Sequence, residues 1–283
     1  METATRPVLV DPSDKIVLFR REFEVTHVPR SAPARIWVDG RYILRVNGEV
    51  VARGPVRAEP RSAHYDFVEI APYLREGSNV FAITARHFGE STSWWVPVPP
   101  TYSLGAGSLV FEALVNDEWI TTDRSWKSQR GEAWTPVPVP GDVACLPLES
   151  CDATQHPWGW EQVGFDDSTW KKAFEITPRH TGADGRKSPP SSPFGMLRPP
   201  VRTSFQGGNS HVAKDVGNAC VVGSPLNADP VRQVLLDQDT PMSTDENAVE
   251  LRFFDLGHIA AGLMTLRIRN AVPGTVIDIA VSE

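Results

Sequence analysis

The stretch RYILRVNGEVVARG, residues 41–54, decides how this chain folds. Two β-rich runs, RYILRV and EVVARG, stand on either side of Asn47-Gly48. Asn-Gly between two such runs is the strongest short-range signal for a β-hairpin. The stretch therefore predicts two antiparallel strands joined by a tight turn.

Further strands are predicted before and after this hairpin. Apolar and polar residues alternate in ARIWVDG (34–40), and two longer β-rich runs follow, NVFAITARHF (79–88) and GSLVFEALV (107–115). The last run places four apolar side chains on one face of a strand: Leu109, Phe111, Ala113 and Val115. Many short strands with Gly and Pro turns indicate an all-β protein, either a β-sandwich or a jelly roll.

Helical signals are few and short. Residues 71–77, APYLREG, predict a single turn closed by a glycine. Residues 166–173, DDSTWKKA, predict a second turn, with Asp167 or Ser168 as its cap. Neither run is long enough to change the all-β assignment.

A Pro- and Gly-rich break divides the chain. Residues 179–210 lose all periodicity, and five prolines fall between Pro189 and Pro200. Such a composition is typical of an extended linker. We expect three parts: a β-sandwich over residues 1–178, a linker and irregular segment over residues 179–248, and an incomplete second β-sandwich over residues 249–283.

The closing stretch, residues 251–283, predicts two strands and a turn. Met264, Leu266 and Ile268 alternate with polar residues, Pro273-Gly274 supplies a turn, and a second alternating run follows. The sequence supplies no strand to cover the edge of this hairpin. We therefore expect the chain to be a fragment of a longer protein.

Composition argues against several classes of binding partner and several cellular locations. The net charge is −7, with 22% charged residues. Nucleic acid and anionic membranes bind to basic surfaces, so neither is expected as the main partner. The start of the chain carries no apolar run behind basic residues, and no segment reaches the ~18 apolar residues that span a bilayer. The three cysteines match no metal spacing, so reduced thiols and a cytoplasmic location are expected.

Motifs for catalysis are missing. The sequence contains no Gly-x-Ser-x-Gly elbow, phosphate-binding loop, His-Glu-x-x-His or Cys-x-x-Cys pattern. Asp166-Asp167 is a tight carboxylate pair, but adjacent carboxylates on a turn diverge and are better suited to capping it. We predict no catalytic residue, no metal site and no cofactor.

One segment suits the binding of a ligand. HFGESTSWWVPVPPTY, residues 87–102, places Glu90, Trp94 and Trp95 in a long connection between two strands. Sugars are recognised by an aromatic face together with polar groups for the hydroxyls. These three residues are the predicted substrate-binding residues, for weak binding of a rhamnose-containing glycan. The alternative is that one of the two indoles closes the open end of the sandwich.

Several phrases resemble one family when taken in order. They are RYILRVNGEVVARGPVR (41–57), YDFVEIAPYLREGSNVFAITARHFGE (65–90), WITTDRSWKS (119–128) and GFDDSTWKKA (164–173). Together they resemble the N-terminal sandwich of bacterial α-L-rhamnosidases, a galactose-binding-like jelly roll. The closing phrase resembles the start of the second β-sandwich of these enzymes. There the family usually has Asp-x-Gly-Gln-Asn-x-x-Gly, whereas this chain has Asp255, Gly257, His258 and Gly262.

This resemblance implies a function and its limits. In the family the chain would continue into a barrel of paired helices that carries the general acid and base. No position here matches that part, so the chain is expected to be inactive alone. We predict a non-catalytic portion of an α-L-rhamnosidase-like glycoside hydrolase that scaffolds the catalytic barrel, in cis or in trans, and contacts glycan. The alternatives are a free-standing carbohydrate-binding module and a docking subunit for a separate catalytic chain.

Overall fold

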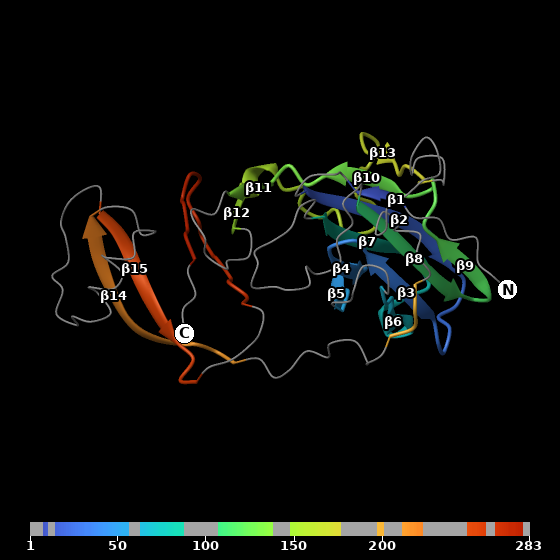
Figure 1. The fold of residues 1–283 in the computed structure, drawn as a ribbon, viewed down its shortest axis with the longest axis horizontal. Helices are drawn as coiled ribbons and strands as arrows, with labels where there is room; N and C mark the ends of the chain where they lie inside the picture. The colour runs from blue at the N-terminus through green and yellow to red at the C-terminus, as the bar shows by residue number, and fades with distance from the viewer. Residues whose placement is uncertain are drawn as a thin grey trace. The chain divides into compact units, whose positions relative to one another are not determined.

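The computed structural model describes residues 8–10, 15–56, 63–87, 107–137, 148–176, 197–200, 211–222, 248–258 and 264–279. The chain forms two compact units, Met1–Gln206 and Gly207–Glu283. Strands β1 to β13 belong to the first unit, and β14 and β15 belong to the second (Figure 1). No helix among the described residues is long and apolar enough to cross a membrane.

The first unit is a sandwich of two antiparallel sheets. One sheet has the strand order β1-β8-β3-β6, with β9 also paired to β8. Its strands are β1 (Val8–Val10), β3 (Pro33–Val38), β6 (Asp66–Glu69), β8 (Gly107–Val115) and β9 (Glu118–Thr121). The second sheet has the order β13-β10-β2-β7-β4-β5. Its strands are β2 (Lys15–Val25), β4 (Arg41–Val46), β5 (Glu49–Gly54), β7 (Gly77–His87), β10 (Lys127–Arg130) and β13 (Lys171–Lys172).

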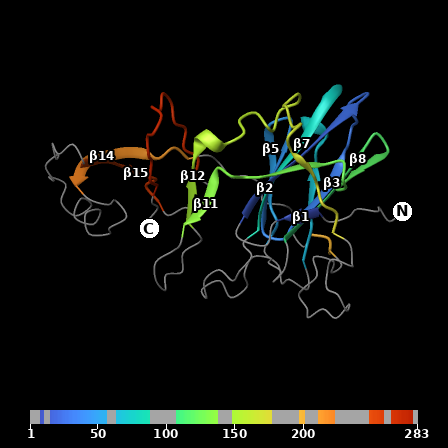
Figure 2. The ribbon, with the colours of Figure 1, turned by 90° about the horizontal axis from the view of Figure 1, so that it is seen from above.

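The view from above separates the two layers, with β2, β7 and β5 in one and β1, β3 and β8 in the other (Figure 2). A short separate ribbon pairs β11 (Trp134–Val137) with β12 (Leu148–Cys151). Two single-turn 3₁₀ helices complete the described elements, η2 (Ala71–Tyr73) and η3 (Ala153–Gln155). The prediction of an all-β sandwich is confirmed.

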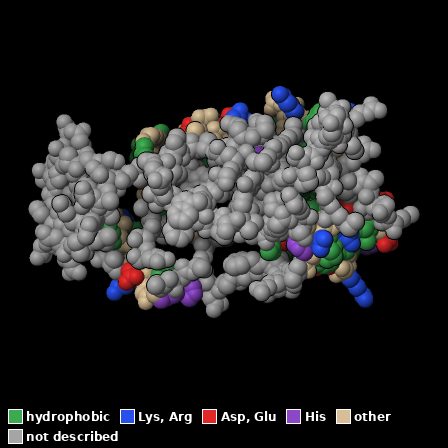
Figure 3. All heavy atoms as spheres, in the orientation of Figure 1, with side chains coloured by type: hydrophobic (Ala, Val, Ile, Leu, Met, Phe, Trp, Pro, Cys, Tyr) green, Lys and Arg blue, Asp and Glu red, His purple; other side chains and the backbone are tan. Residues whose placement is uncertain are grey.

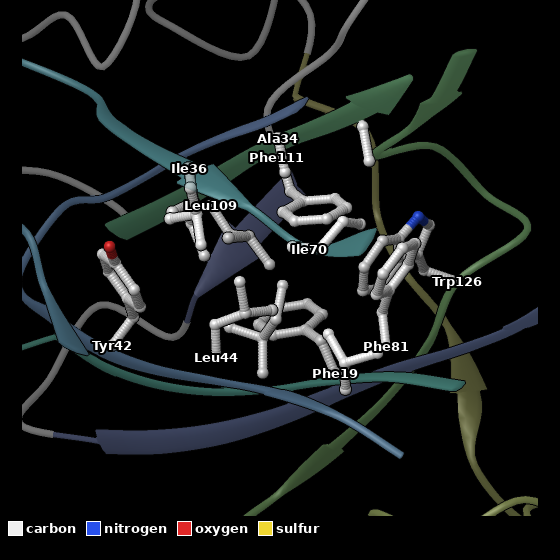
Figure 4. Close-up of a cluster of buried hydrophobic side chains, with 14 of the residues drawn as sticks. Phe19, Ala34, Ile36, Tyr42, Leu44, Ile70, Phe81, Leu109, Phe111 and Trp126 are labelled. Atoms are coloured by element: carbon white, nitrogen blue, oxygen red, sulfur yellow. The ribbon is translucent and has the colours of Figure 1, made fainter. Parts of the chain in front are cut away.

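The core lies between the two sheets, where the inward-facing side chains of both meet (Figure 4). All four apolar residues predicted on one face of β8 are buried in it. Aromatic rings fill its centre: Phe81 stacks on Phe23 at 4.3 Å between ring centroids, and Phe111 meets Trp126 edge-on at 5.5 Å. Full burial of each such side chain contributes about 1.5–3 kcal/mol, so this core is a major source of the stability of the sandwich.

The predicted hairpin of residues 41–54 is formed by β4 and β5. Asn47 and Gly48 have φ of 52° and 86°, the left-handed conformation that a tight two-residue hairpin turn requires. The Asn47 side chain also donates to the carbonyl of Tyr73 and to the side chain of Asn79, and it accepts from the backbone of Val80. Asn47 therefore ties the turn to the start of β7, which gives it a structural role.

A polar contact joins the two sheets at one end of the core. The Tyr42 hydroxyl, from β4, donates to Asp66 Oδ2, from β6, at 2.5 Å. Burial is the largest cause that raises the pKa of the Asp66 carboxyl, and burial together with Asp66 raises the pKa of Tyr42. Gly54 is required beside this pair, because a Cβ there would lie 2.1 Å from Asp66 Oδ2.

The two predicted helical turns have different outcomes. Residues 71–73 do form one turn of helix, η2. The helical turn predicted over residues 166–173 is wrong, since this stretch forms a non-helical turn, closed by the Trp170 N–H to Asp167 carbonyl hydrogen bond, and then β13. The physical reason is the edge of β10, to which β13 adds in register, so that tertiary pairing overrides a weak local helical preference.

The second unit contains one two-stranded antiparallel sheet. It pairs β14 (Lys214–Val222) with β15 (Ala248–Asp255), with an irregularity between Asp215 and Gly217. Strand β14 falls within residues 179–248, for which an irregular segment is expected. Earlier in that stretch, residues 197–200 run beside residues 63–65, with an Arg198 N–H to Ala63 carbonyl distance of 2.9 Å.

The strand predicted from Met264 to Ile268 is not formed, and residues 264–279 contain no strand. The turn at Pro273-Gly274 is present, closed by a Thr275 N–H to Val272 carbonyl hydrogen bond of 3.0 Å. Met264 and Ile268 are 61% and 51% exposed. An alternating pattern becomes a strand only where a neighbouring strand supplies backbone partners and a face to bury, and residues 264–279 have neither among the described residues.

Candidate functional site

The residues predicted to bind sugar, Glu90, Trp94 and Trp95, lie outside the described residues. The same holds for Gly262 of the family phrase near the end of the chain. Binding at residues 87–102 therefore stays a prediction. The candidate site below is built from the parts of the chain that the structure describes.

Seven of the nine tryptophans are described, and most are structural. Trp126 is fully buried between the sheets, while Trp160 and Trp170 are buried on the outer face of the six-stranded sheet. Trp158 is the most exposed of the described tryptophans, at 72%, while Trp119 is 38% exposed. An exposed indole costs hydration free energy, so its position and support need an explanation.

Arg20 attaches the segment that carries Trp158 to the sheet. Its side chain lies on the outer face of β2 and is 1% exposed. Its guanidinium donates to the carbonyl oxygens of Trp160, Gln162 and Phe165 and to the carboxylates of Glu22 and Asp167. The planar guanidinium carries five N–H donors in a fixed geometry, which suits this arrangement. It gives hydrogen-bond donors to three backbone carbonyls that would otherwise lack them.

The Trp158 indole is held in one orientation. Asp152 accepts hydrogen bonds from the backbone N–H of Thr154 at 3.0 Å and from the side chain of Gln155 at 2.7 Å, which fixes the turn η3. The first carbonyl of that turn, on Ala153, then accepts from Trp158 Nε1 at 2.9 Å. The indole is therefore anchored through its edge while most of its surface stays in contact with water.

An aromatic row continues from Trp158 into the protein. The His156 ring meets Trp158 edge-on at 4.5 Å between centroids and meets Trp134 edge-on at 5.1 Å on its other side. Burial is the largest cause that lowers the pKa of His156 below 6.5, opposed by Glu161 and assisted by Arg45. The imidazole is therefore predominantly neutral at pH 7, with one ring nitrogen free to accept.

Charged side chains lie beside this row. Arg45, on β4, donates to Thr84 Oγ1 at 3.2 Å, and its pKa is lowered mainly by burial, with Glu161 raising it and Arg53 lowering it. We refer to five residues as the Trp158 cluster: Arg45, Trp134, His156, Trp158 and Glu161. Two atoms of the cluster, His156 Nδ1 and Glu161 Oε2, are buried without any hydrogen-bond partner.

Buried polar atoms are nearly always hydrogen-bonded, so these two unpaired atoms mark an unsatisfied place beneath the surface next to the exposed ring. Glu161 Oε2 accepts only, and His156 Nδ1 accepts or donates according to its tautomer. The exposed Trp158 indole is the flat apolar surface of this group.

The cluster has no means of hydrolysing a glycosidic bond. Glu161 is its single carboxylate, and hydrolysis calls for two carboxyl groups roughly 5–9.5 Å apart on either side of the bond. Within the described parts of the chain, no three His, Cys, Asp or Glu side chains are placed to hold a metal ion.

The other residues weighed in the sequence have structural partners. Asp166 accepts from the backbone N–H of Ser168 at 3.0 Å, and Asp167 pairs with Arg20, so the predicted turn-capping role is confirmed for Asp166. His258 follows a turn in which Asp255 accepts from the Gly257 N–H, and its ring meets His211 at 5.1 Å. The structure gives His258 no partner of catalytic character among the described residues.

A second group of aromatic side chains lies on the outer face of the five-stranded sheet. The Arg35 guanidinium sits 5.6 Å from the Tyr65 ring and 5.8 Å from the Trp119 ring, and it pairs with Glu112 at 2.7 Å. Hydrophobic, basic and histidine side chains gather over β6 and β3 on the face shown in Figure 3. Arg35 is already paired, so this group is a completed surface contact and a weaker candidate than the Trp158 cluster.

Sequence reasoning missed the Trp158 cluster. A signal was available in residues 152–170, DATQHPWGWEQVGFDDSTW, where three tryptophans fall within 13 residues behind an Asp that can cap a turn. Which of the three faces solvent depends on Arg20, which lies 140 residues away from Trp160. Local patterning does not contain that contact.

Comparisons with known proteins agree on one family. The α-L-rhamnosidase N-terminal domain matches residues 28–192, more than half of the chain. The rhamnosidase of family GH78 from Bacillus sp. GL1 is 26% identical, with a TM-score of 0.64, over 80% of this chain and 22% of that one. The Streptomyces avermitilis α-L-rhamnosidase complexed with L-rhamnose is 20% identical, with a TM-score of 0.50, over 75% and 21% of the two chains.

These matches limit what the likeness supports. No curated protein matches the chain. The chain spans about a fifth of the length of the two rhamnosidases. The structural likeness to the Streptomyces enzyme concerns the fold alone, whereas the family match rests on the sequence. The chain belongs to the α-L-rhamnosidase N-terminal domain family.

Proposed function

We propose that the chain is the non-catalytic N-terminal portion of an α-L-rhamnosidase-like glycoside hydrolase, where it scaffolds the catalytic barrel and contacts glycan. The observation that carries this proposal is the family match over residues 28–192 in a chain that spans about a fifth of the matched enzymes. A sandwich with a well-filled core and an anchored outer segment is a rigid body on which a larger enzyme can be built.

Glycan contact is assigned to the Trp158 cluster. The exposed indole offers a flat apolar surface to the C–H face of a pyranose. One shallow platform with a few hydrogen bonds supports affinities of roughly millimolar, about −4 kcal/mol. The segment with Glu90, Trp94 and Trp95 is a second proposed contact for rhamnose-containing glycan.

The binding test is a titration of the full chain with L-rhamnose and with rhamnose-containing oligosaccharides, followed by protein NMR. Trp158→Ala should weaken binding at least about tenfold, because the stacking platform is lost, and Trp94→Ala and Trp95→Ala report on the second contact. Trp119→Ala is the matched control, since Trp119 is a partly exposed indole on the other sheet. Unchanged binding in all three variants, each still folded, would leave only the scaffold role.

Inactivity is tested with a chromogenic α-L-rhamnoside. Release of product by the purified chain should not exceed that of buffer, because the Trp158 cluster lacks a carboxylate pair. Turnover that co-purifies with the chain and disappears in Glu161→Gln would contradict the proposal.

The alternative functions separate in a trans experiment. A scaffold or docking subunit should co-elute with a separately expressed rhamnosidase catalytic barrel and raise its melting temperature, as ligands of a folded state do. A free-standing carbohydrate-binding module should bind sugar without any effect on the barrel. The match to a domain of much longer enzymes favours the first outcome.

A further inference from the structure

We infer that His211 and His258 form a two-histidine site for a divalent metal ion of the Zn²⁺ type, and that the bound ion clamps the ends of β14 and β15. Both histidines belong to the second unit, so this site is independent of the glycan contact proposed above. No metal site is expected from the sequence, because the two histidines are far apart along the chain.

The register of the two-stranded sheet brings the two histidines together. At one end of the sheet, Lys214 on β14 is opposite Asp255 on β15 (Figure 1). His211 lies three residues before Lys214, and His258 lies three residues after Asp255. The antiparallel register, continued past the strands, therefore puts the two histidines opposite each other. The distance of 5.1 Å between their ring centroids agrees with this placement.

The separation and inclination of the two rings suit ligation of one ion. An imidazole nitrogen binds Zn²⁺ at about 2.0–2.1 Å, which places the ring centroid about 3.2 Å from the ion and puts two such centroids about 5.2 Å apart at a tetrahedral angle. The observed distance is 5.1 Å. The planes are inclined by 73°, whereas two stacked rings could not direct their in-plane lone pairs to one point. Both side chains are exposed, so an ion reaches them directly.

Two imidazoles also select the class of ion. Imidazole suits Zn²⁺, Ni²⁺ and Cu²⁺, whereas Mg²⁺ and Ca²⁺ take oxygen ligands. No group of three possible ligands is found among the described residues, so the remaining coordination positions fall to water. The family phrase usually has Gln where this chain has His258, so the histidine pair is a feature of this chain.

A clamp at this position has a physical consequence. An isolated two-stranded sheet is only marginally stable in water. Strand β14 ends at Val222 and β15 begins at Ala248, so a long connection joins the strands at the end of the sheet that is far from the histidines. A metal link that closes such a long loop removes much of the chain entropy gained when the strands separate.

The binding test is a titration of the full chain with Zn²⁺, followed by NMR of the histidine side chains. The resonances of His211 and His258 should shift together, and Mg²⁺ should shift neither. His211→Gln and His258→Gln should each weaken Zn²⁺ binding at the remaining histidine at least about tenfold, since even an outer-shell partner of a metal ligand is typically worth that much. His27→Gln is the matched control, an exposed histidine of the first unit that should leave this binding unchanged.

Amide hydrogen exchange tests the clamp. At a Zn²⁺ concentration about a hundredfold above Kd, the β14 and β15 amides should exchange about a hundredfold more slowly, because an ion that binds only the paired strands lowers the open population by that factor. Without Zn²⁺, both variants should exchange like the parent, which controls for folding. Unchanged exchange, a shift of only one of the two histidines, or equal Zn²⁺ affinity in His258→Gln overturns the inference. The proposed function stands or falls separately, since it uses neither histidine.

Discussion

Replacement of Arg20 by methionine should detach the segment that carries the Trp158 cluster. The substitution keeps the apolar stem and removes the guanidinium, which leaves the carbonyls of Trp160, Gln162 and Phe165 without their donor. Removing one partner of a buried ion pair costs about 3–5 kcal/mol. The carboxylates of Glu22 and Asp167 are 38% and 26% exposed and recover some hydration, so we expect a loss near the lower end, about 3 kcal/mol.

Unfolding in guanidinium chloride, followed by tryptophan fluorescence and by circular dichroism, measures this loss of unfolding free energy. For a unit of this size, about 3 kcal/mol corresponds to a melting temperature lower by roughly 6–12 °C. Fluorescence should shift to the red even before unfolding, because Trp160 and Trp170 lose their burial against the sheet. Arg30→Met controls for the loss of a positive charge. A loss below about 1 kcal/mol, or an equal loss in the control, would refute the anchoring role of Arg20.

Three further predictions concern the polar contacts of the sandwich. Gly54→Ala should lower the melting temperature by several degrees, at a cost of about 1–3 kcal/mol, because the new Cβ meets Asp66 Oδ2 at 2.1 Å; a variant as stable as the parent in a thermal melt would contradict the tight packing there. The raised pKa of Asp66 means that the folded state binds its proton more tightly than the unfolded state, so this group makes stability fall as pH rises through the window above 3.8. Asp66→Asn should flatten the unfolding free energy against pH in that window, and an unchanged slope would remove Asp66 as its source. Glu161→Gln should lower the pKa of His156 further in an NMR titration, because the carboxylate raises it, and an equal or higher pKa would place Glu161 elsewhere.

Expectations that rested on local chemistry are confirmed. The hairpin of residues 41–54 needs only two neighbouring residues that tolerate positive φ, and Asn47 and Gly48 occupy these positions. The buried face of β8 follows from a period of two, which the backbone imposes on any strand. The family resemblance is confirmed by the match over residues 28–192. It rested on several segments of sequence in a fixed order, which can be recognised without a structure.

Two expectations were wrong because they depended on strand partners far along the chain. Residues 171–172 form a strand because β10 offers an edge, and Met264 to Ile268 stay exposed because no strand pairs with them among the described residues. Their local patterns suggested a helix in the first case and a strand in the second. Pairing is a property of two segments, and each segment carries only half of the information.

The candidate site shows the same division between local and long-range causes. From its own residues, the sequence determined an all-β sandwich, its turns and a surplus of tryptophans. It did not determine which indole faces water. That depends on Arg20, which binds the carbonyls of a segment 140 to 145 residues away, where Trp160 and Trp170 are buried while Trp158 stays exposed. Backbone carbonyls are the same in every residue, so a contact made to them leaves no mark on the residue types that a reader of the sequence can see.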